Sequence, residues 1–150
     1  MRFTWLLAPA ALFAASPVAA QISVAPVRDL AFGAVIVGLP TYIGPSHPTR
    51  SGQFRVTAPP LSRVQIRLTL PSQLDGPAGA AMPISFSNND ALHVDAGANG
   101  VPSTFNPKAT RNVEVTSGTA FVFVGGTVTP TAAQPQGTYA GTITLTINIQ

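Results

Sequence analysis

The amino-acid sequence predicts a single all-β domain, a sandwich or barrel of mostly antiparallel strands. Three observations lead to this prediction. Apolar and polar residues alternate at the end of the chain, from Tyr139 to Gln150, as in a strand with one buried face. Turn-forming residues are plentiful, with 13 Gly and 15 Pro, whereas charged residues make up only 9% of the chain. No stretch beyond residue 20 sustains the 3.6-residue apolar period of a helix.

The start of the chain has the pattern of a secretory signal peptide. Arg2 provides a positive charge, an apolar stretch covers 6–15, and the small residues V-A-A at 18–20 form a cleavage site. The apolar stretch is shorter than the roughly 20 residues of a membrane-spanning helix. We therefore expect 1–20 to be removed and 21–150 to form one exported β-sandwich domain, with no transmembrane segment in the mature chain.

Short runs of alternating or apolar residues, separated by Pro, Gly and Asn, define the expected strands. We expect strands at 22–27, 30–37, 53–57, 64–70, 84–87, 91–94, 112–116, 120–129 and 139–149. The alternation in 64–70 turns Val64, Ile66, Leu68 and Leu70 inward. The pair Gly125-Gly126 predicts a bulge or corner. Strands of this number and spacing favour a sandwich or barrel.

The final strand carries the largest predicted burial of apolar side chains. Its inward row is Tyr139, Ile143, Leu145, Ile147 and Ile149. Full burial of these five side chains would contribute about 8–15 kcal/mol. The whole stability of a typical domain is about 5–15 kcal/mol. We therefore expect this row to be covered, either by its own domain or by another polypeptide.

Residues that carry chemistry are scarce. The chain has no Cys, which excludes disulfides, thiol nucleophiles and cysteine metal sites. Its five carboxylates are scattered, and His47 and His93 share no metal-ligand spacing. The segment around Ser46 lacks the context of a nucleophile elbow. We predict no catalytic, cofactor-binding or metal-binding residues, and hence no enzyme. The formal net charge of +3 is too small to indicate a nucleic-acid partner.

Several motifs resemble a known group of proteins. They are D-L-A-F-G at 29–33, R-S-G-Q-F at 50–54, G-G-T at 125–127 and Q-G-T-Y-A-G-T-I at 136–143. Together they resemble a family of small secreted bacterial β-domains of unassigned function. That family is similar to the spore coat protein U domain and, more distantly, to chaperone–usher fimbrial (pilin) subunits. The resemblance covers nearly all of 21–150.

The resemblance implies an immunoglobulin-like sandwich and a place in the periplasm, on the cell surface or in a fimbria of a bacterium. In fimbrial subunits a neighbouring subunit or a periplasmic chaperone supplies a missing strand by β-strand addition. This chain differs in having no cysteine pair and only a short segment, 21–28, ahead of Asp29.

Arginines form the only charged group that stands out. If 53–57 and 64–70 pair as a hairpin, Arg55 and Arg67 share its outward face. Such a face either protects a sheet edge in solvent or weakly attracts anionic glycans or lipopolysaccharide.

Our leading hypothesis is an exported, pilin-like structural subunit that assembles by β-strand addition. Ile22, Val24 and Val27 are the predicted donor residues, and the inward row of 139–149 forms part of the acceptor. The alternative is a self-contained monomeric domain that binds an anionic surface glycan through Arg55 and Arg67. A secreted hydrolase is a remote third hypothesis.

Overall fold

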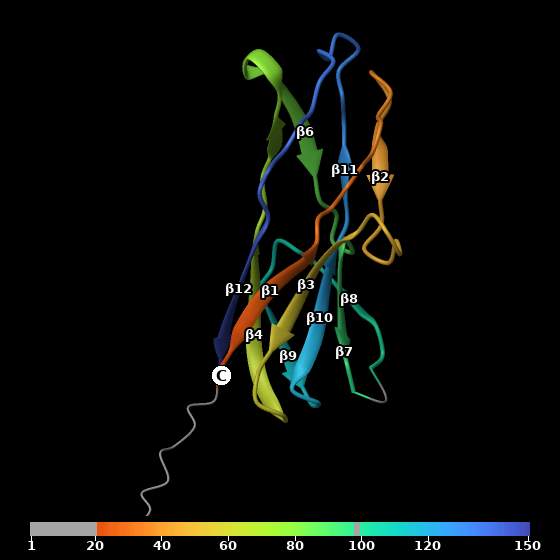
Figure 1. Cartoon of the computed structure of the whole chain (residues 1–150). Helices are drawn as coiled ribbons and strands as arrows, with labels where there is room; N and C mark the ends of the chain where they lie inside the picture. Colours follow the sequence, from red (N-terminus) through yellow and green to blue (C-terminus); the bar gives the residue numbers. More distant parts are fainter. Residues whose placement is uncertain (1–20, 98–99) are drawn as a thin grey trace, which may run out of the picture.

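The computed structural model describes residues 21–97 and 100–150, so the predicted signal peptide, 1–20, lies outside the described residues. The described residues form an all-β sandwich with antiparallel strand pairs, as predicted (Figure 1). The helical content described is a single 3-10 turn, Pro77–Gly79. Within these residues no helix is long and apolar enough to cross a membrane.

Three groups of hydrogen-bonded strands make up the fold. The five-stranded sheet has the order β1 (Ser23–Arg28), β3 (Gly52–Thr57), β10 (Thr119–Val124), β7 (Ala91–Asp95) and β8 (Ser103–Phe105). The three-stranded sheet has the order β12 (Thr144–Ile149), β4 (Ser62–Thr69) and β9 (Arg111–Val115). The four-stranded sheet has the order β2 (Thr41–Ile43), β11 (Gly126–Val128), β6 (Ala81–Ser85) and β5 (Gln73–Asp75).

The core lies between the five-stranded and three-stranded sheets. Alternate residues of β3, β4, β9 and β10 meet there in one cluster of buried side chains, which includes Val56, Val64, Ile66, Val115 and Val122. The predicted inward direction of Val64, Ile66 and Leu68 is confirmed. β-Branched residues dominate because they pack well on pleated strands.

Gly125 lets one long strand pass from one sheet to another. β10 precedes it in the five-stranded sheet and β11 follows it in the four-stranded sheet (Figure 1). A Cβ at Gly125 would collide with the backbone of Ile43 and Pro45, so only glycine fits there. The Gly125 N–H donates to the carbonyl of Asp90 at 2.7 Å. The predicted corner is confirmed.

The final strand differs from its prediction. Only Thr144–Ile149 forms β12, and the preceding segment is irregular except for a bridge between Ala140 and Asp75. Leu145 is buried, but Ile149 is 49% exposed. β12 is an edge strand paired only with β4, so it lacks the cover that the predicted full burial requires. The estimate of 8–15 kcal/mol from the complete row is therefore too high.

Two other predictions are wrong. The segment 30–37 forms no strand, because Gly33 adopts a φ of +72° and turns the chain away from a ladder. The hairpin of 53–57 with 64–70 does not form, since β3 pairs with β1 and β10 whereas β4 pairs with β12 and β9. The short strands β2, β5 and β8 lie outside all of the strands expected from the sequence.

Candidate functional site

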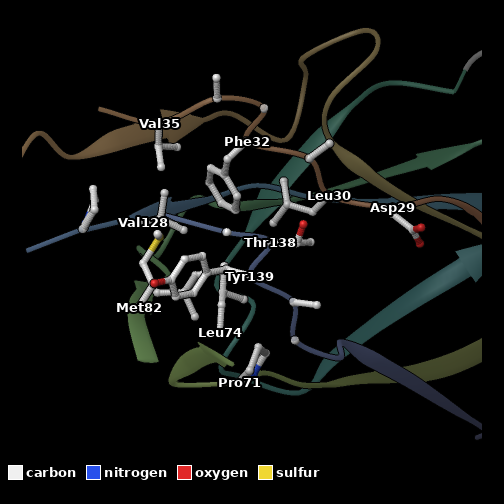
Figure 2. A pocket seen from close by; sticks show the side chains of 18 of the residues that line it. Asp29, Leu30, Phe32, Val35, Pro71, Leu74, Met82, Val128, Thr138 and Tyr139 are labelled. Carbon is white, nitrogen blue, oxygen red and sulfur yellow. The ribbon is translucent and has the colours of Figure 1, made fainter. Parts of the chain in front are cut away.

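An apolar groove with a volume of about 720 Å³ begins where β1 ends. Its two walls are the segment that follows β1 and the segment that precedes β12. Figure 2 shows Phe32 and Val35 on one side, with Tyr139, Leu74 and Met82 on the other. Met82, Ile84 and Val128, from β6 and β11, are buried members of the core that line it as well. The groove is therefore an opening into the core of the sandwich.

Backbone groups along the walls of the groove are largely without backbone partners. On one wall, Ala31 donates to the carbonyl of Arg50 at 2.9 Å. From Phe32 to Val37 the only backbone–backbone bond formed among described residues is the one that the Ile36 carbonyl accepts from Leu39. On the other wall, 136–139 forms none among described residues. Two irregular walls with few backbone partners, over an apolar floor, offer backbone groups with which a β-strand from another chain could pair.

A polar cluster fixes the Tyr139 wall. Gln134 is 8% exposed, and its Nε2 donates to the Ala81 carbonyl at 3.1 Å and to the Tyr139 hydroxyl oxygen at 2.8 Å. The Tyr139 hydroxyl donates to the Pro135 carbonyl at 2.7 Å. The Tyr139 ring lies so close to Gly76 that any side chain there would collide with it. These contacts fix the Tyr139 ring in the wall of the groove, so the ring does not turn into the groove and fill it.

β1 lies in the same gap between the sheets, next to the groove. It pairs antiparallel with β3, from Ser23 opposite Thr57 to Arg28 opposite Gln53, and lies beside β12 (Figure 1). Ile22 and Val24 pack against the core but are only partly buried, and Val27 is 46% exposed at a bulge. Four of the six residues of β1 are exposed. β1 is thus an edge strand with little buried apolar surface.

The structure places most of the predicted donor and acceptor residues on one core within one chain, but Val27 and Ile149 are exposed and lie outside it. Ile22 and Val24 pack on the same core as the row before and within β12. Tyr139 and Ile143 line the groove, and Leu145 and Ile147 contact the core beyond it.

Arg28 anchors the end of β1. Its Nε and one terminal nitrogen donate to the carbonyl and the hydroxyl of Ser51 at 2.8 and 2.9 Å. Its other terminal nitrogen donates to the Pro48 carbonyl at 2.6 Å. Ser51 is fully buried and its hydroxyl donates to the His47 carbonyl at 2.7 Å, so this end of β1 is tied to the buried part of the loop 44–51. The residues before Arg28 have no comparable side-chain tie among the described contacts.

Arg55 and Arg67 lie in different sheets and point away from each other. The Arg55 side chain extends from the outer face of the five-stranded sheet, and its guanidinium carbon lies over the Phe121 ring, 5.9 Å from the ring centroid. Arg67 is opposite Thr146 on the outer face of the three-stranded sheet. The structure therefore does not combine them into one surface.

Burial and hydrogen bonds shift the pKa values of two ionisable groups in β7, Asp95 and His93. Partial desolvation raises the pKa of Asp95, but hydrogen bonds from Thr116, Gly97 and Ser117 outweigh it and bring that pKa to about 2. Burial lowers the pKa of His93, whose Nε2 lacks a described partner. In 21–97 and 100–150, no three His, Asp or Glu side chains gather closely enough to hold a metal ion.

Sequence reasoning missed Arg28, Gln134 and the open wall at 30–37. Arg28 directly precedes the D-L-A-F-G motif, and Gln134 precedes Pro135 in a turn-rich segment. Their roles depend on partners that are distant in sequence, which a local pattern does not show. Only the clustering of motifs at both walls could have indicated this site.

Residues 22–149 match the model of a protein family described as "Domain of unknown function (DUF4402)". A comparison with curated proteins found no match.

Proposed function

The chain belongs to the DUF4402 family of domains of unknown function, and we propose that it is an exported structural subunit that assembles with its neighbours by β-strand addition. The leader-like segment 1–20 supports the export part of this proposal, and a bacterial surface or fimbrial location is part of it as well. Neighbouring copies are the main partners. A periplasmic chaperone would cover the same edge before assembly.

One observation carries this proposal: an exposed edge strand and an unfilled apolar groove share a single gap between the sheets. β1 covers part of that gap with four of its six residues exposed. The remainder is the groove of about 720 Å³, on both walls of which, among the described residues, the backbone is largely without backbone partners. A strand from another chain would pair with such walls and cover the apolar floor.

Exchange of β1 between copies is the simplest form of this assembly; it would use the edge of β3 beside the groove rather than the groove itself. The neighbour's β1 would make the same pairing with β3 and the same contacts of Ile22 and Val24, so little free energy is lost on exchange. Arg28 would remain in place as the pivot. Fully extended, 22–27 spans about 20 Å, which reaches an adjoining copy but not a distant one.

Truncation tests the proposal. Mature protein 21–150 should form concentration-dependent multimers or fibres in light scattering and electron microscopy, and a variant that begins at Arg28 should not. A peptide of residues 21–28 should bind the truncated protein and raise its melting temperature. The same peptide with Val24→Asp should do neither, because the charge would enter the apolar core.

One outcome of the truncation experiment would rule out assembly through β1. If 21–150 and the truncated variant are both concentration-independent monomers with the same melting temperature, β1 is not an assembly strand. Arg67→Gln, on the outer face of the other sheet, is the matched control and should leave assembly unchanged.

A further inference from the structure

The outer faces of the two main sheets differ in character. On the three-stranded sheet, outward side chains are polar: Arg63 forms an ion pair with Glu114 at 3.2 Å, and Gln65 donates to Asn112 at 3.3 Å. On the five-stranded sheet, Leu92 and Val94 of β7 lie opposite Phe123 and Phe121 of β10. We call these four residues the aromatic face. They are half-buried and are not among the side chains packed against the core.

A recess with a volume of about 370 Å³ lies between the aromatic face and the loop 44–51. Phe123, Leu92 and Val94 form its apolar side. The polar residues Gln53, His47 and Arg28 also line it. Apolar lining with a few polar groups is the usual composition of a small-ligand site, and this volume falls within the usual range of about 300–1,000 Å³.

The histidine of the recess has a defined orientation. His47 Nδ1 accepts hydrogen bonds from the backbone N–H groups of Thr49 and Arg50 at 3.3 and 3.2 Å. In the neutral ring the proton therefore sits on Nε2, which is left as a hydrogen-bond donor. Gln53 adds an amide that both donates and accepts.

Arg28 gives the recess its positive charge. Its three described hydrogen bonds go to uncharged oxygens, the carbonyls of Pro48 and Ser51 and the Ser51 hydroxyl. A guanidinium has five N–H donors, so two remain. Among the described residues that line the recess, none is acidic. A carboxylate from outside would find an uncompensated cation there.

The geometry points to this recess as a binding site for an acidic sugar, a hexuronate unit of a surface polysaccharide. The apolar face of the sugar ring would lie on Phe123, its hydroxyls would bond to Gln53 and His47, and its carboxylate would face Arg28. A simple inorganic anion would leave the aromatic face unused, and a neutral sugar would leave the charge of Arg28 unused. This site does not depend on the proposed exchange of β1.

Titration with two oligosaccharides of equal length tests the inference. Tetragalacturonate is the acidic probe and maltotetraose is the neutral one, each followed by amide chemical shifts and calorimetry on the mature protein. Tetragalacturonate should shift the amides of Gln53, Leu92 and Phe123 and bind about tenfold more tightly than maltotetraose. Phe123→Thr should weaken binding about tenfold, because it removes the apolar platform while keeping a strand-favouring residue.

Arg67→Gln is the matched control on the opposite sheet and should leave affinity unchanged. Phe123 points outward, so the melting temperature of Phe123→Thr should stay close to that of the parent and show that the domain is folded. Three results would overturn the inference: no shift with tetragalacturonate, equal affinity for both oligosaccharides, or an equal loss of affinity in Arg67→Gln and Phe123→Thr.

Discussion

At the scale of single residues, buried polar side chains determine the shape of the groove. Gln134 is a buried polar residue that joins the wall carrying Tyr139 to β6 through the Ala81 carbonyl. When a buried amide is removed, the groups that it bonded to are left unsatisfied. The free-energy cost of this is larger than the net stabilisation that a typical hydrogen bond provides.

Gln134→Ala should lower the free energy of unfolding by about 1–3 kcal/mol, because the buried Gln134 amide is lost and the Ala81 carbonyl and the Tyr139 hydroxyl lose a donor in a partly buried setting. Urea denaturation measures the change. Gln73→Ala is the control, since the one hydrogen bond described for the Gln73 side chain goes to Asp75 on the surface, and its loss should stay within about 0.5 kcal/mol. Equal effects of the two substitutions would show that Gln134 does not hold the wall.

The lowered pKa of Asp95 predicts how the stability of the protein depends on pH. Its pKa falls from 3.8 to about 2 on folding. The stability that it contributes is therefore complete above pH 3.8 and is lost as the pH falls toward 2. Melting temperatures across this range should fall less steeply in Asp95→Asn than in the parent. Identical slopes would mean that the hydrogen bonds from Thr116 and Ser117 do not favour the carboxylate.

At the scale of elements, the corner between β10 and β11 connects the core to the groove. β10 supplies Val122 and Val124 to the core, and β11 supplies Val128 to the groove. Gly125 must approach the backbone of Ile43 closely for the strand to change sheets. The position of the groove relative to the core thus depends on this one residue.

Gly125→Ala should destabilise the protein by about 1–3 kcal/mol, since the new methyl group meets backbone atoms that cannot move aside. Thermal unfolding measures it. Gly44→Ala, whose added methyl group would meet only the side chain of Tyr42 at 3.4 Å or more, is the control and should stay within about 0.5 kcal/mol. A tolerated Gly125→Ala would contradict the close approach.

Elements were predictable where local pattern decides them. The alternation around Ile66 gave the correct inward face of β4, because a period of two fixes the direction of side chains whichever strand lies alongside. The same pattern does not specify partners, so β3 and β4 were wrongly paired and Arg55 and Arg67 wrongly placed on one face. The segment 30–37 has strand-like composition, but Gly33 prevents a ladder.

At the scale of the whole molecule, the sandwich is closed along one part of its edge and open along the other. β1 closes the first part with a loosely buried strand, and the groove leaves the second part open. Of the predicted donor residues, Ile22 and Val24 pack on the same core as most of the predicted acceptor row, within one chain, whereas Val27 and Ile149 are exposed. Sequence alone could not locate the groove, because its walls are 100 residues apart in the chain, as from 37 to 137, and are unpaired irregular segments.

Covalent capture of β1 tests the central claim most directly. Ala25 lies opposite Arg55 in the pairing of β1 with β3, and both side chains are exposed. The natural chain lacks cysteine, so a disulfide formed in the double variant Ala25→Cys/Arg55→Cys reports only this pairing. The single variants are the controls and should yield no species larger than a dimer.

If β1 exchanges between copies, oxidation of the double variant under assembly conditions gives a ladder of disulfide-linked multimers on a non-reducing gel. If oxidation gives only an internally linked monomer at every concentration, β1 stays in its own domain, and assembly by exchange of β1 is contradicted.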